Sequence, residues 1–412
     1  MLPPHLMPPH LVQMLLNLMP SPFLTGAWPS WSAPSSGWNL GWQTPPPNPF
    51  ASLLNQWQSQ QSPNVSAEFI EIAQALAEEA LARSQQTLEG MAAFSRESAP
   101  RSESSHSVLW QRGSARLLDY APDATESVAI FCVPSLINKY YILDLMPEHS
   151  MVNMLKAQGF RPLVLDWGTP GEAELGFSCA DYITAYALDA LHALRESHEG
   201  PITLLGYCMG GIFTVAMAQL AAFDCDGLML LSTPWDFSAK DTPVVLLNPA
   251  AHTLLSAWFE GFSPVPPWLI QGIFTLIHPW AAQEKFRKFA DLPENERAQF
   301  IALEQWVNDG VPLVKNVASE VFVAWPQQNI LANHQWKVGR SWIEPSRIRC
   351  PSFVALPAHD KIVPTGVAMP LARMLPKATI HTPEAGHVSM VAGKHAPNQL
   401  WKPLSKWLKQ HF

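Results

Sequence analysis

A cysteine framed by glycines constrains the fold of this chain more than any other feature. The apolar run over residues 201–207 leads into Gly206-Tyr-Cys-Met-Gly-Gly211, and an amphipathic segment follows over residues 212–220. A strand, a sharp turn and a helix in this order predict a nucleophile elbow with Cys208 at its tip. Because the tip residue has a strained backbone, the positions two before and two after it must be nearly free of side chain, and both are glycine. The alternative is a buried cysteine in an ordinary strand-to-helix turn.

An elbow of this kind would give Cys208 a chemical role. The turn exposes the sulfur and places it at a helix N-terminus, whose partial positive charge favours an anion. The backbone N–H of Met209 would then be one donor of an oxyanion hole.

Length, charge and cysteine usage exclude several classes of protein. The chain has 412 residues and a net charge of -8, which argues against general binding to nucleic acid. Its five cysteines are scattered, without the short paired spacing of zinc or disulfide frameworks, so we expect a reducing cytoplasm and no metal site. The N-terminus does not resemble a secretion signal, and no apolar run is long enough to span a bilayer.

Strands alternate with helices on both sides of the elbow. Apolar runs at 128–133, 161–167, 202–207, 227–232, 351–357 and 378–382 predict buried strands, and the segments 145–158, 181–196, 367–375 and 400–408 predict helices. This rhythm predicts an α/β fold with a mostly parallel sheet, flanked by helices, whose reactive loops lie at the carboxyl ends of the strands.

Changes in composition divide the chain into five parts. Residues 1–65 are rich in proline and tryptophan and predict a disordered arm, either a mere tail or an adhesive segment. Residues 66–108 predict an amphipathic helix and a linker. Residues 109–235 and 336–412 carry the strands, and the stretch 236–335 between them predicts an inserted, mainly helical cap over the site.

A cysteine nucleophile needs a histidine base and a carboxylate that orients it. In doubly wound hydrolase folds these residues follow the nucleophile in the order acid, then histidine, on later strand ends. Asp360 follows the strand 351–357 and His387 follows the strand 378–382. We therefore predict a triad of Cys208, His387 and Asp360.

Other residues compete for these roles, and each has a plain structural alternative. His359 is a second candidate base, although it adjoins the acid and would point elsewhere. Asp236 and Asp309 are reserve acids, whose ordinary roles would be helix capping and a solvated loop. Asp360 itself could be a turn aspartate, and His387 a surface-loop histidine.

The loop after the strand ending at Val133 should supply the second oxyanion donor. This loop reads Pro134-Ser-Leu-Ile-Asn-Lys-Tyr-Tyr141, and a backbone N–H at Leu136 or Ile137 is the expected donor. Asn138 would hold the loop by side-chain hydrogen bonds, unless it serves ordinary turn chemistry. We assign Asn138 and Tyr207, which precedes the nucleophile, to substrate binding.

Between about residues 115 and 410 the chain resembles the polyhydroxyalkanoate synthases. The two specific segments are residues 133–148, beginning Val133-Pro-Ser-Leu-Ile-Asn, and Gly206-Tyr-Cys-Met-Gly-Gly211. Weaker likenesses are Asp166-Trp-Gly-Thr-Pro170, Trp306-Val-Asn-Asp-Gly310, Asp360-Lys-Ile-Val-Pro364 and Gly386-His387.

The resemblance implies an α/β-hydrolase fold and the same triad, carried onto Cys208, His387 and Asp360. It also implies a 3-hydroxyacyl coenzyme A substrate, with coenzyme A as part of the substrate and no separate cofactor. A homodimer or a second synthase subunit, and a cytoplasmic location on polyester granules, are implied as well. The segment beginning at Asp166 is more similar to the shorter, two-subunit synthases.

The chain departs from the family pattern at three positions. Lys361 follows the acid where the family usually has histidine, and Ser389 and Met390 stand soon after His387 where the family has a small residue. Two other classes of function stay open from the residues alone. One is a thiol hydrolase, such as an intracellular depolymerase or thioesterase, and the other is a non-catalytic granule-associated protein.

Overall fold

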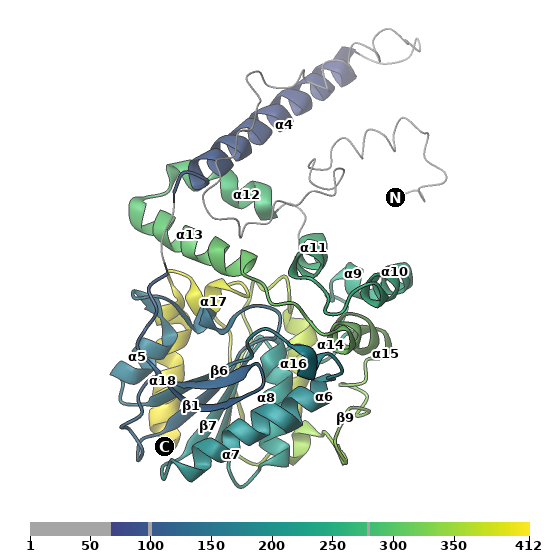
Figure 1. Cartoon of the computed structure of the whole chain (residues 1–412). Helices are drawn as coiled ribbons and strands as arrows, with labels where there is room; N and C mark the ends of the chain where they lie inside the picture. The colour runs from purple at the N-terminus through teal and green to yellow at the C-terminus, as the bar shows by residue number, and fades with distance from the viewer. Residues whose placement is uncertain (1–66, 98–100, 278–280) are drawn as a thin grey trace. The chain divides into compact units, whose positions relative to one another are not determined.

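The computed structural model describes residues 67–97, 101–277 and 281–412, and its centre is an eight-stranded sheet (Figure 1). The spatial order of the strands is β1-β2-β6-β3-β7-β8-β11-β12. Their bounds are β1 (Ser107–Arg112), β2 (Ala115–Asp119), β3 (Ala129–Val133), β6 (Arg161–Asp166), β7 (Ile202–Tyr207), β8 (Gly227–Leu231), β11 (Ser352–Ala355) and β12 (Ala378–His381).

Six of these strands, from β6 to β12, are parallel neighbours, and β1 and β2 add an antiparallel edge beside β6. Strands β3 and β7 are buried at every position, as expected for the apolar runs that encode them. The prediction of an α/β-hydrolase fold with a mostly parallel sheet is confirmed.

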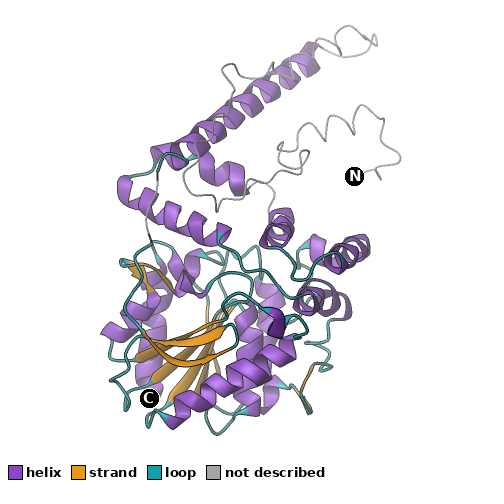
Figure 2. Cartoon of the chain, in the orientation of Figure 1, coloured by secondary structure: helices purple, strands orange, loops and turns teal. Residues whose placement is uncertain are grey.

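Helices cover both faces of the sheet (Figure 2). They are α5 (Met151–Ala157), α6 (Cys179–Asp181), α7 (Leu188–Glu196), α8 (Met209–Leu220), α16 (Thr365–Met374), α17 (Ser389–Ala392) and α18 (Lys402–His411). Successive side chains of β3 alternate between two apolar cores: Phe131 belongs to one, and Ile130 and Cys132 belong to the other. The central strands of the sheet are therefore buried on both faces.

The structure differs from the sequence prediction at two places in the first half of the core. Strands β1 and β2 are short and partly polar, so no apolar run in the sequence predicted them. The predicted helix 145–158 begins only at Met151, because Pro147 interrupts the segment. Before it lies a small hairpin of β4 (Asp144–Met146) and β5 (His149–Ser150), and the Ser150 hydroxyl caps α5 by accepting the Asn153 N–H at 3.1 Å.

Helices occupy most of the chain between β8 and β11. They are α9 (Val244–Leu247), α10 (Pro249–Glu260), α11 (Pro267–Ile277), α12 (Ala281–Arg287), α13 (Glu294–Asn308), α14 (Lys315–Ser319) and α15 (Trp325–Gln328). Two short strands, β9 (Lys337–Val338) and β10 (Ser341–Trp342), follow before β11.

The chain divides into two compact units, Met1–Leu81 and Ala82–Phe412. The expected arm over residues 1–65 lies outside the described residues. Helix α4 (Ala67–Phe94) begins in the first unit, and in the second unit Phe94 packs against Phe286, Phe289 and Phe300. Along the same helix Leu88 and Met91 are exposed.

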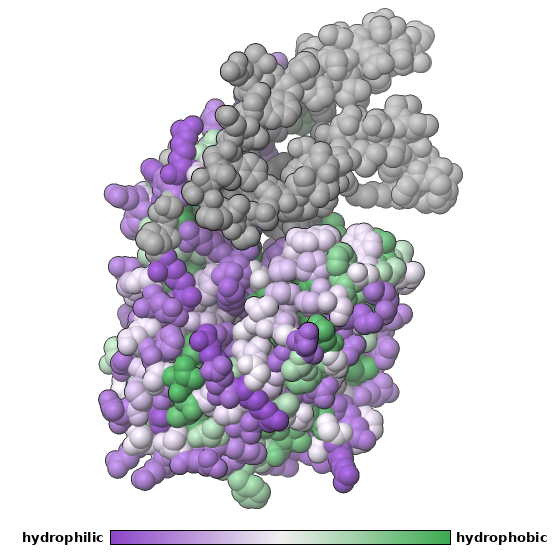
Figure 3. Space-filling model, in the orientation of Figure 1, coloured by the Kyte–Doolittle hydropathy of each residue, from purple (hydrophilic) through white to green (hydrophobic). Residues whose placement is uncertain are grey.

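Polar side chains cover most of the visible face of the second unit, with apolar side chains in small patches (Figure 3). Within residues 67–97, 101–277 and 281–412, we find no helix with the length and apolar character needed to cross a bilayer.

Candidate active site

Cys208 lies at the turn between the central strand β7 and helix α8. Its backbone has φ 56° and ψ −127°, a strained conformation for a residue with a side chain, and it is the N-cap of α8. A Cβ at Gly206 would lie 2.4 Å from the Cα of Gly211, and a Cβ at Gly210 would lie 2.1 Å from the carbonyl oxygen of Val133. The two glycines are therefore required by close approach of backbone on either side of the cysteine.

His387 and Asp360 lie together in the turns that follow β12 and β11. The imidazole Nδ1 and the carboxylate Oδ2 are 2.7 Å apart, and both side chains are buried. Asp360 Oδ1 accepts the backbone N–H groups of Ile362 at 2.9 Å and Val363 at 2.8 Å. The carboxylate is thus held from both sides, and its second oxygen orients the ring.

Burial and charge act in opposite directions on this pair. Burial alone would lower the pKa of His387, but the charges of Asp360 and the Cys208 sulfur, with a hydrogen bond to each, raise the pKa well above its usual value. Burial would raise the pKa of Asp360, but the His387 charge and the hydrogen bonds that the carboxylate accepts lower it. The site therefore favours an imidazolium beside a carboxylate.

Cys208 and His387 open into one apolar cavity of about 140 Å³. Helices α11 and α13 close it with Gln271, Phe274, Trp306 and Val307. The remaining lining residues come from the ends of the strands and the segments that follow them: Pro134, Ser135, Ile137, Asn138, Lys139, Ile142, Tyr207, Ile362 and Val388. An apolar lining around a nucleophile limits access of water to it.

Tyr207 directly precedes the candidate nucleophile and contacts His387. Its ring centroid is 5.3 Å from that of His387, and its hydroxyl donates to the His387 carbonyl oxygen at 3.3 Å. Burial, with the nearby charges of Cys208 and Asp360, raises the pKa of this tyrosine well above its usual value. Tyr207 lines the cavity as a neutral phenol that also holds the histidine turn.

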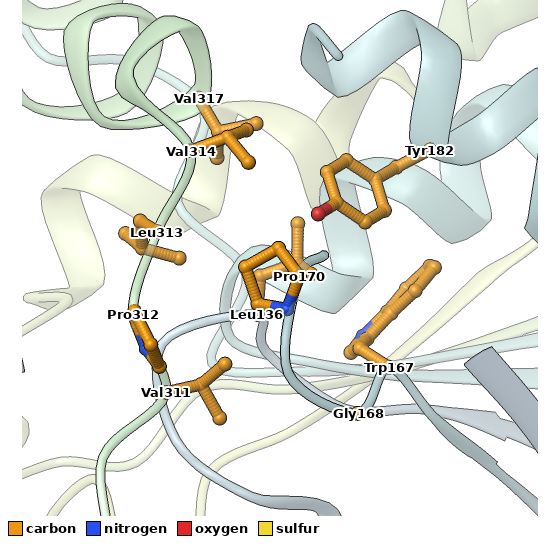
Figure 4. A pocket seen from close by; sticks show the side chains of 10 residues that line it. All are labelled: Leu136, Trp167, Gly168, Pro170, Tyr182, Val311, Pro312, Leu313, Val314 and Val317. Carbon is orange, nitrogen blue, oxygen red and sulfur yellow. The ribbon is translucent and has the colours of Figure 1, made fainter. Parts of the chain in front are cut away.

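The loop after β3 brings the predicted oxyanion residues beside the elbow. The Ile137 N–H already donates to Ser135 Oγ at 3.2 Å, whereas in the described part of the chain the N–H groups of Leu136 and Met209 have no acceptor. The Leu136 side chain lines a separate cleft with Trp167, Pro170 and the segment that carries Val311 (Figure 4). Burial of that side chain helps to fix the loop.

Asn138 joins this loop to the end of α13. Its Nδ2 donates to the carbonyl oxygens of Trp306 at 3.4 Å and Val307 at 3.2 Å, and it forms an antiparallel bridge with Gly310. In return, Trp306 Nε1 donates to the Lys139 carbonyl oxygen at 2.8 Å. The segments 133–148 and 306–310, which both resemble the synthase family, are therefore neighbours in space.

The reserve candidates lie away from the imidazole. Asp309 accepts the Tyr141 hydroxyl at 2.9 Å and pairs with Lys139 at 2.8 Å. Asp236 accepts hydrogen bonds from Ser238 and Asn329. His359 is exposed and pairs with Glu384 at 3.1 Å. Each of these three residues therefore has polar partners other than the His387 imidazole.

The three departures from the family pattern have different surroundings. Lys361 is exposed, and Ser389 is exposed with its Oγ accepting the Gly386 N–H at 2.9 Å. Met390 lies in α17 and is buried in the core. Sequence reasoning missed Gln271, Phe274 and Trp306 as lining residues, since no local pattern distinguishes a helix residue that faces a cavity from one that faces the core.

Among the described residues, no group of three or more His, Cys, Asp or Glu side chains is arranged to hold a metal ion. A thiol, an imidazole and a carboxylate in sequence, next to free backbone N–H groups, are suited to acyl transfer through a covalent intermediate.

Comparison with known proteins gives a consistent result. The α/β hydrolase fold family matches residues 129–393, and the N-terminal region of poly-beta-hydroxybutyrate polymerase (PhaC) matches residues 101–155. A poly(3-hydroxyalkanoate) polymerase subunit PhaC from Haloferax mediterranei is 28% identical over 74% of this chain and 63% of that protein. Those from Haloarcula marismortui and Allochromatium vinosum are 26% and 25% identical, over 89% and 70% of this chain and 77% and 82% of the relatives. The chain belongs to the α/β hydrolase fold family, and in sequence it is similar to the polyhydroxyalkanoate synthases.

Proposed function

We propose that this chain polymerises 3-hydroxyacyl groups from coenzyme A thioesters into polyester, with Cys208 as the nucleophile. The observation that carries the proposal is that His387, paired with Asp360 and hydrogen-bonded to Cys208, lines the same apolar cavity as Cys208. Relatives named poly(3-hydroxyalkanoate) polymerase subunits support the choice of substrate and product.

In the first half-reaction Cys208 attacks the thioester carbonyl and coenzyme A leaves. His387 takes the thiol proton, and the imidazolium returns it to the departing coenzyme A sulfur. The raised pKa of His387 stabilises that imidazolium. The N–H groups of Met209 and Leu136 would hold the carbonyl oxygen as it becomes negative.

In the second half-reaction the 3-hydroxyl of another acyl unit attacks the acyl-cysteine. His387 removes the hydroxyl proton, and Cys208 leaves as the new ester bond forms. One thioester has been exchanged for another before the ester forms, so the energy of the thioester remains available for the second step. The apolar lining from Ile137, Phe274 and Val307 would disfavour water as the competing nucleophile.

The partners follow from the same proposal. The substrate is a 3-hydroxyacyl coenzyme A, the product surface is a polyester granule in the cytoplasm, and the active assembly is a homodimer or a complex with a second synthase subunit. The word subunit in the names of the relatives supports the latter.

The test is coenzyme A release from 3-hydroxybutyryl coenzyme A by the full chain, alone and with a partner subunit, with the product sized by chromatography. We expect the wild type to release coenzyme A and form polymer. In Cys208→Ala the rate of coenzyme A release should be at least about a thousandfold lower, which is roughly the loss expected when an enzyme lacks its nucleophile. Cys350→Ala, which is remote from the cavity, should match the wild type under reducing conditions. Free 3-hydroxybutyrate in place of polymer would identify a thiol hydrolase, and no coenzyme A release in either assembly would refute the proposal.

A further inference from the structure

Two cysteines outside the active site lie close enough to react with each other. Cys225 and Cys350 are separated by 125 positions in the sequence, yet their sulfur atoms are 4.0 Å apart. Cys225 precedes β8 and Cys350 precedes β11, and these strands are parallel neighbours, with the Leu228 N–H donating to the Pro351 carbonyl oxygen at 3.0 Å. Both thiols therefore stand at the amino edge of the sheet, opposite the strand ends that carry Cys208 and Asp360.

The two thiols have different surroundings. Cys225 is buried with 6% of its surface exposed, whereas Cys350 is half-buried and can be reached from solvent. The hydrogen-bond contact between the two thiols, with the charge of nearby Lys377, lowers the pKa of Cys350 against the effect of burial. The same hydrogen bond and burial raise the pKa of Cys225 well above its usual value. Access and thiolate character therefore coincide on Cys350.

We propose that Cys225 and Cys350 form a peroxide-sensitive thiol pair that closes to a reversible disulfide. The Cys350 thiolate attacks one oxygen of a hydroperoxide, such as hydrogen peroxide, whose O–O bond breaks, and the departing hydroxide takes up a proton to leave as water. Cys350 becomes a sulfenic acid. The Cys225 thiol then attacks the Cys350 sulfur, the disulfide forms, and the sulfenic hydroxyl leaves as a second water with the Cys225 proton. Two thiols are thus oxidised by two electrons and one peroxide is reduced.

The two sulfur atoms need to move only a short distance to form this disulfide. The sulfur atoms of a disulfide are about 2 Å apart, so each must move by about 1 Å, which side-chain rotation supplies. The bond would join the chain just before β8 to the chain just before β11 and so enclose the whole helical insertion between those strands. Because the pair lies at the opposite end of the strands from Cys208, the inference does not depend on the acyl-transfer reaction.

The experiment treats the full chain, in the Cys208→Ala background, with hydrogen peroxide and then quenches with catalase. The five cysteines become four in this background. We expect free thiols under denaturing conditions to fall from about four to about two per chain, and to return after dithiothreitol. Peptide mapping without reduction should recover a species that joins the peptides of Cys225 and Cys350, two hydrogens lighter than their sum.

Two single variants then test the order of the steps. In Cys225→Ser, Cys350 loses its partner, so the sulfenic acid should persist and take one dimedone adduct at Cys350. In Cys350→Ser, Cys225 should take no adduct. Cys132→Ser, at a core position remote from the pair, should form the bridge as the parent does. Recovery of Cys225 and Cys350 as free thiols after peroxide, or a bridge to another cysteine in preference, would overturn the proposal.

Discussion

At the scale of single residues, charge and hydrogen bonding couple His387 to the other two candidate catalytic groups, Asp360 and Cys208. The imidazole is buried and would lose its proton if it stood alone, yet Asp360 and Cys208 raise its pKa. Protonation of His387 therefore depends on the negative charge of the Asp360 carboxylate, to which the imidazole is hydrogen-bonded.

Replacing Asp360 by asparagine should show this dependence directly. The substitution keeps the size of the side chain and removes its charge, so burial then acts unopposed and the pKa of His387 falls. We expect coenzyme A release near pH 7 to fall roughly 10²- to 10⁴-fold, with the fold retained. Asp236→Asn is the matched control and should stay within about twofold of the wild type. Equal losses in the two variants would contradict the assignment of Asp360 as the acid.

The same pair makes a pH-dependent contribution to stability. Because the pKa of His387 is raised, its contribution is complete below about pH 6.5, the usual pKa of an unfolded histidine, and is lost as the pH rises through the folded value. The lowered pKa of Asp360 gives a contribution that is present above about pH 3.9 and lost as the pH falls through the folded value.

We therefore expect the difference in unfolding free energy between the wild type and Asp360→Asn to be largest between about pH 4 and pH 6.5. The difference should narrow at more alkaline pH, because folded His387 then loses its proton. Urea unfolding of both proteins at about pH 5, 7 and 9 measures it. A difference that widens with rising pH would show that the histidine is neutral in the folded chain.

At the scale of elements, the turn between β7 and α8 depends on backbone contact that leaves no room for side chains. Gly210, in the first turn of α8, lies against the end of β3, where the loop with the candidate oxyanion donors begins. The positions of the nucleophile and of that loop are thus coupled through one glycine.

Gly210→Ala tests this coupling. Its Cβ would lie 2.1 Å from the Val133 carbonyl oxygen and 2.6 Å from that of Pro134, and both are backbone atoms that cannot turn aside. We expect a loss of about 1–3 kcal/mol or more of stability, with coenzyme A release reduced at least tenfold. In α11, Gly272 has nothing within 4 Å of its would-be Cβ, so Gly272→Ala should instead stabilise the chain by about 0.5–1 kcal/mol. Thermal and urea unfolding compare the two, and similar effects would refute the argument from contact.

At the scale of the whole molecule, the described chain extends beyond the hydrolase core. Phe94, at the end of α4, packs edge-on against Phe286 and Phe300 with ring centroids 5.4 and 6.0 Å apart. The end of α4 is in this way part of the hydrophobic cluster of the α12 and α13 region.

Phe94→Ala should therefore lower the free energy of unfolding by about 3–5 kcal/mol, the usual cost of removing a buried aromatic side chain. Leu88 lies on the same helix with 66% of its surface exposed, and Leu88→Ala should change stability by less than about 0.5 kcal/mol. Denaturant unfolding of the second unit measures both. A Phe94→Ala protein as stable as the wild type would place α4 outside the folded unit.

Local patterns in the sequence determined the parallel sheet and the positions of the three candidate catalytic residues. A buried parallel strand is an uninterrupted apolar run, and an elbow needs glycines two positions from the nucleophile, so both leave a signature within ten residues or so. The order of strands then assigned Asp360 and His387 to the correct loops, because carboxyl ends of parallel strands share one edge.

Only the tertiary structure decided which distant segments meet. It brought Asn138 against Trp306, separated Asp309 from the base, and set Cys225 beside Cys350 across neighbouring strands. No pattern along the chain encodes such contacts, because each partner looks locally like an ordinary turn or core residue. These contacts form because apolar surface must be buried on both faces of the sheet. Segments from the whole chain contribute to that burial, so the contacts depend on the complete tertiary structure.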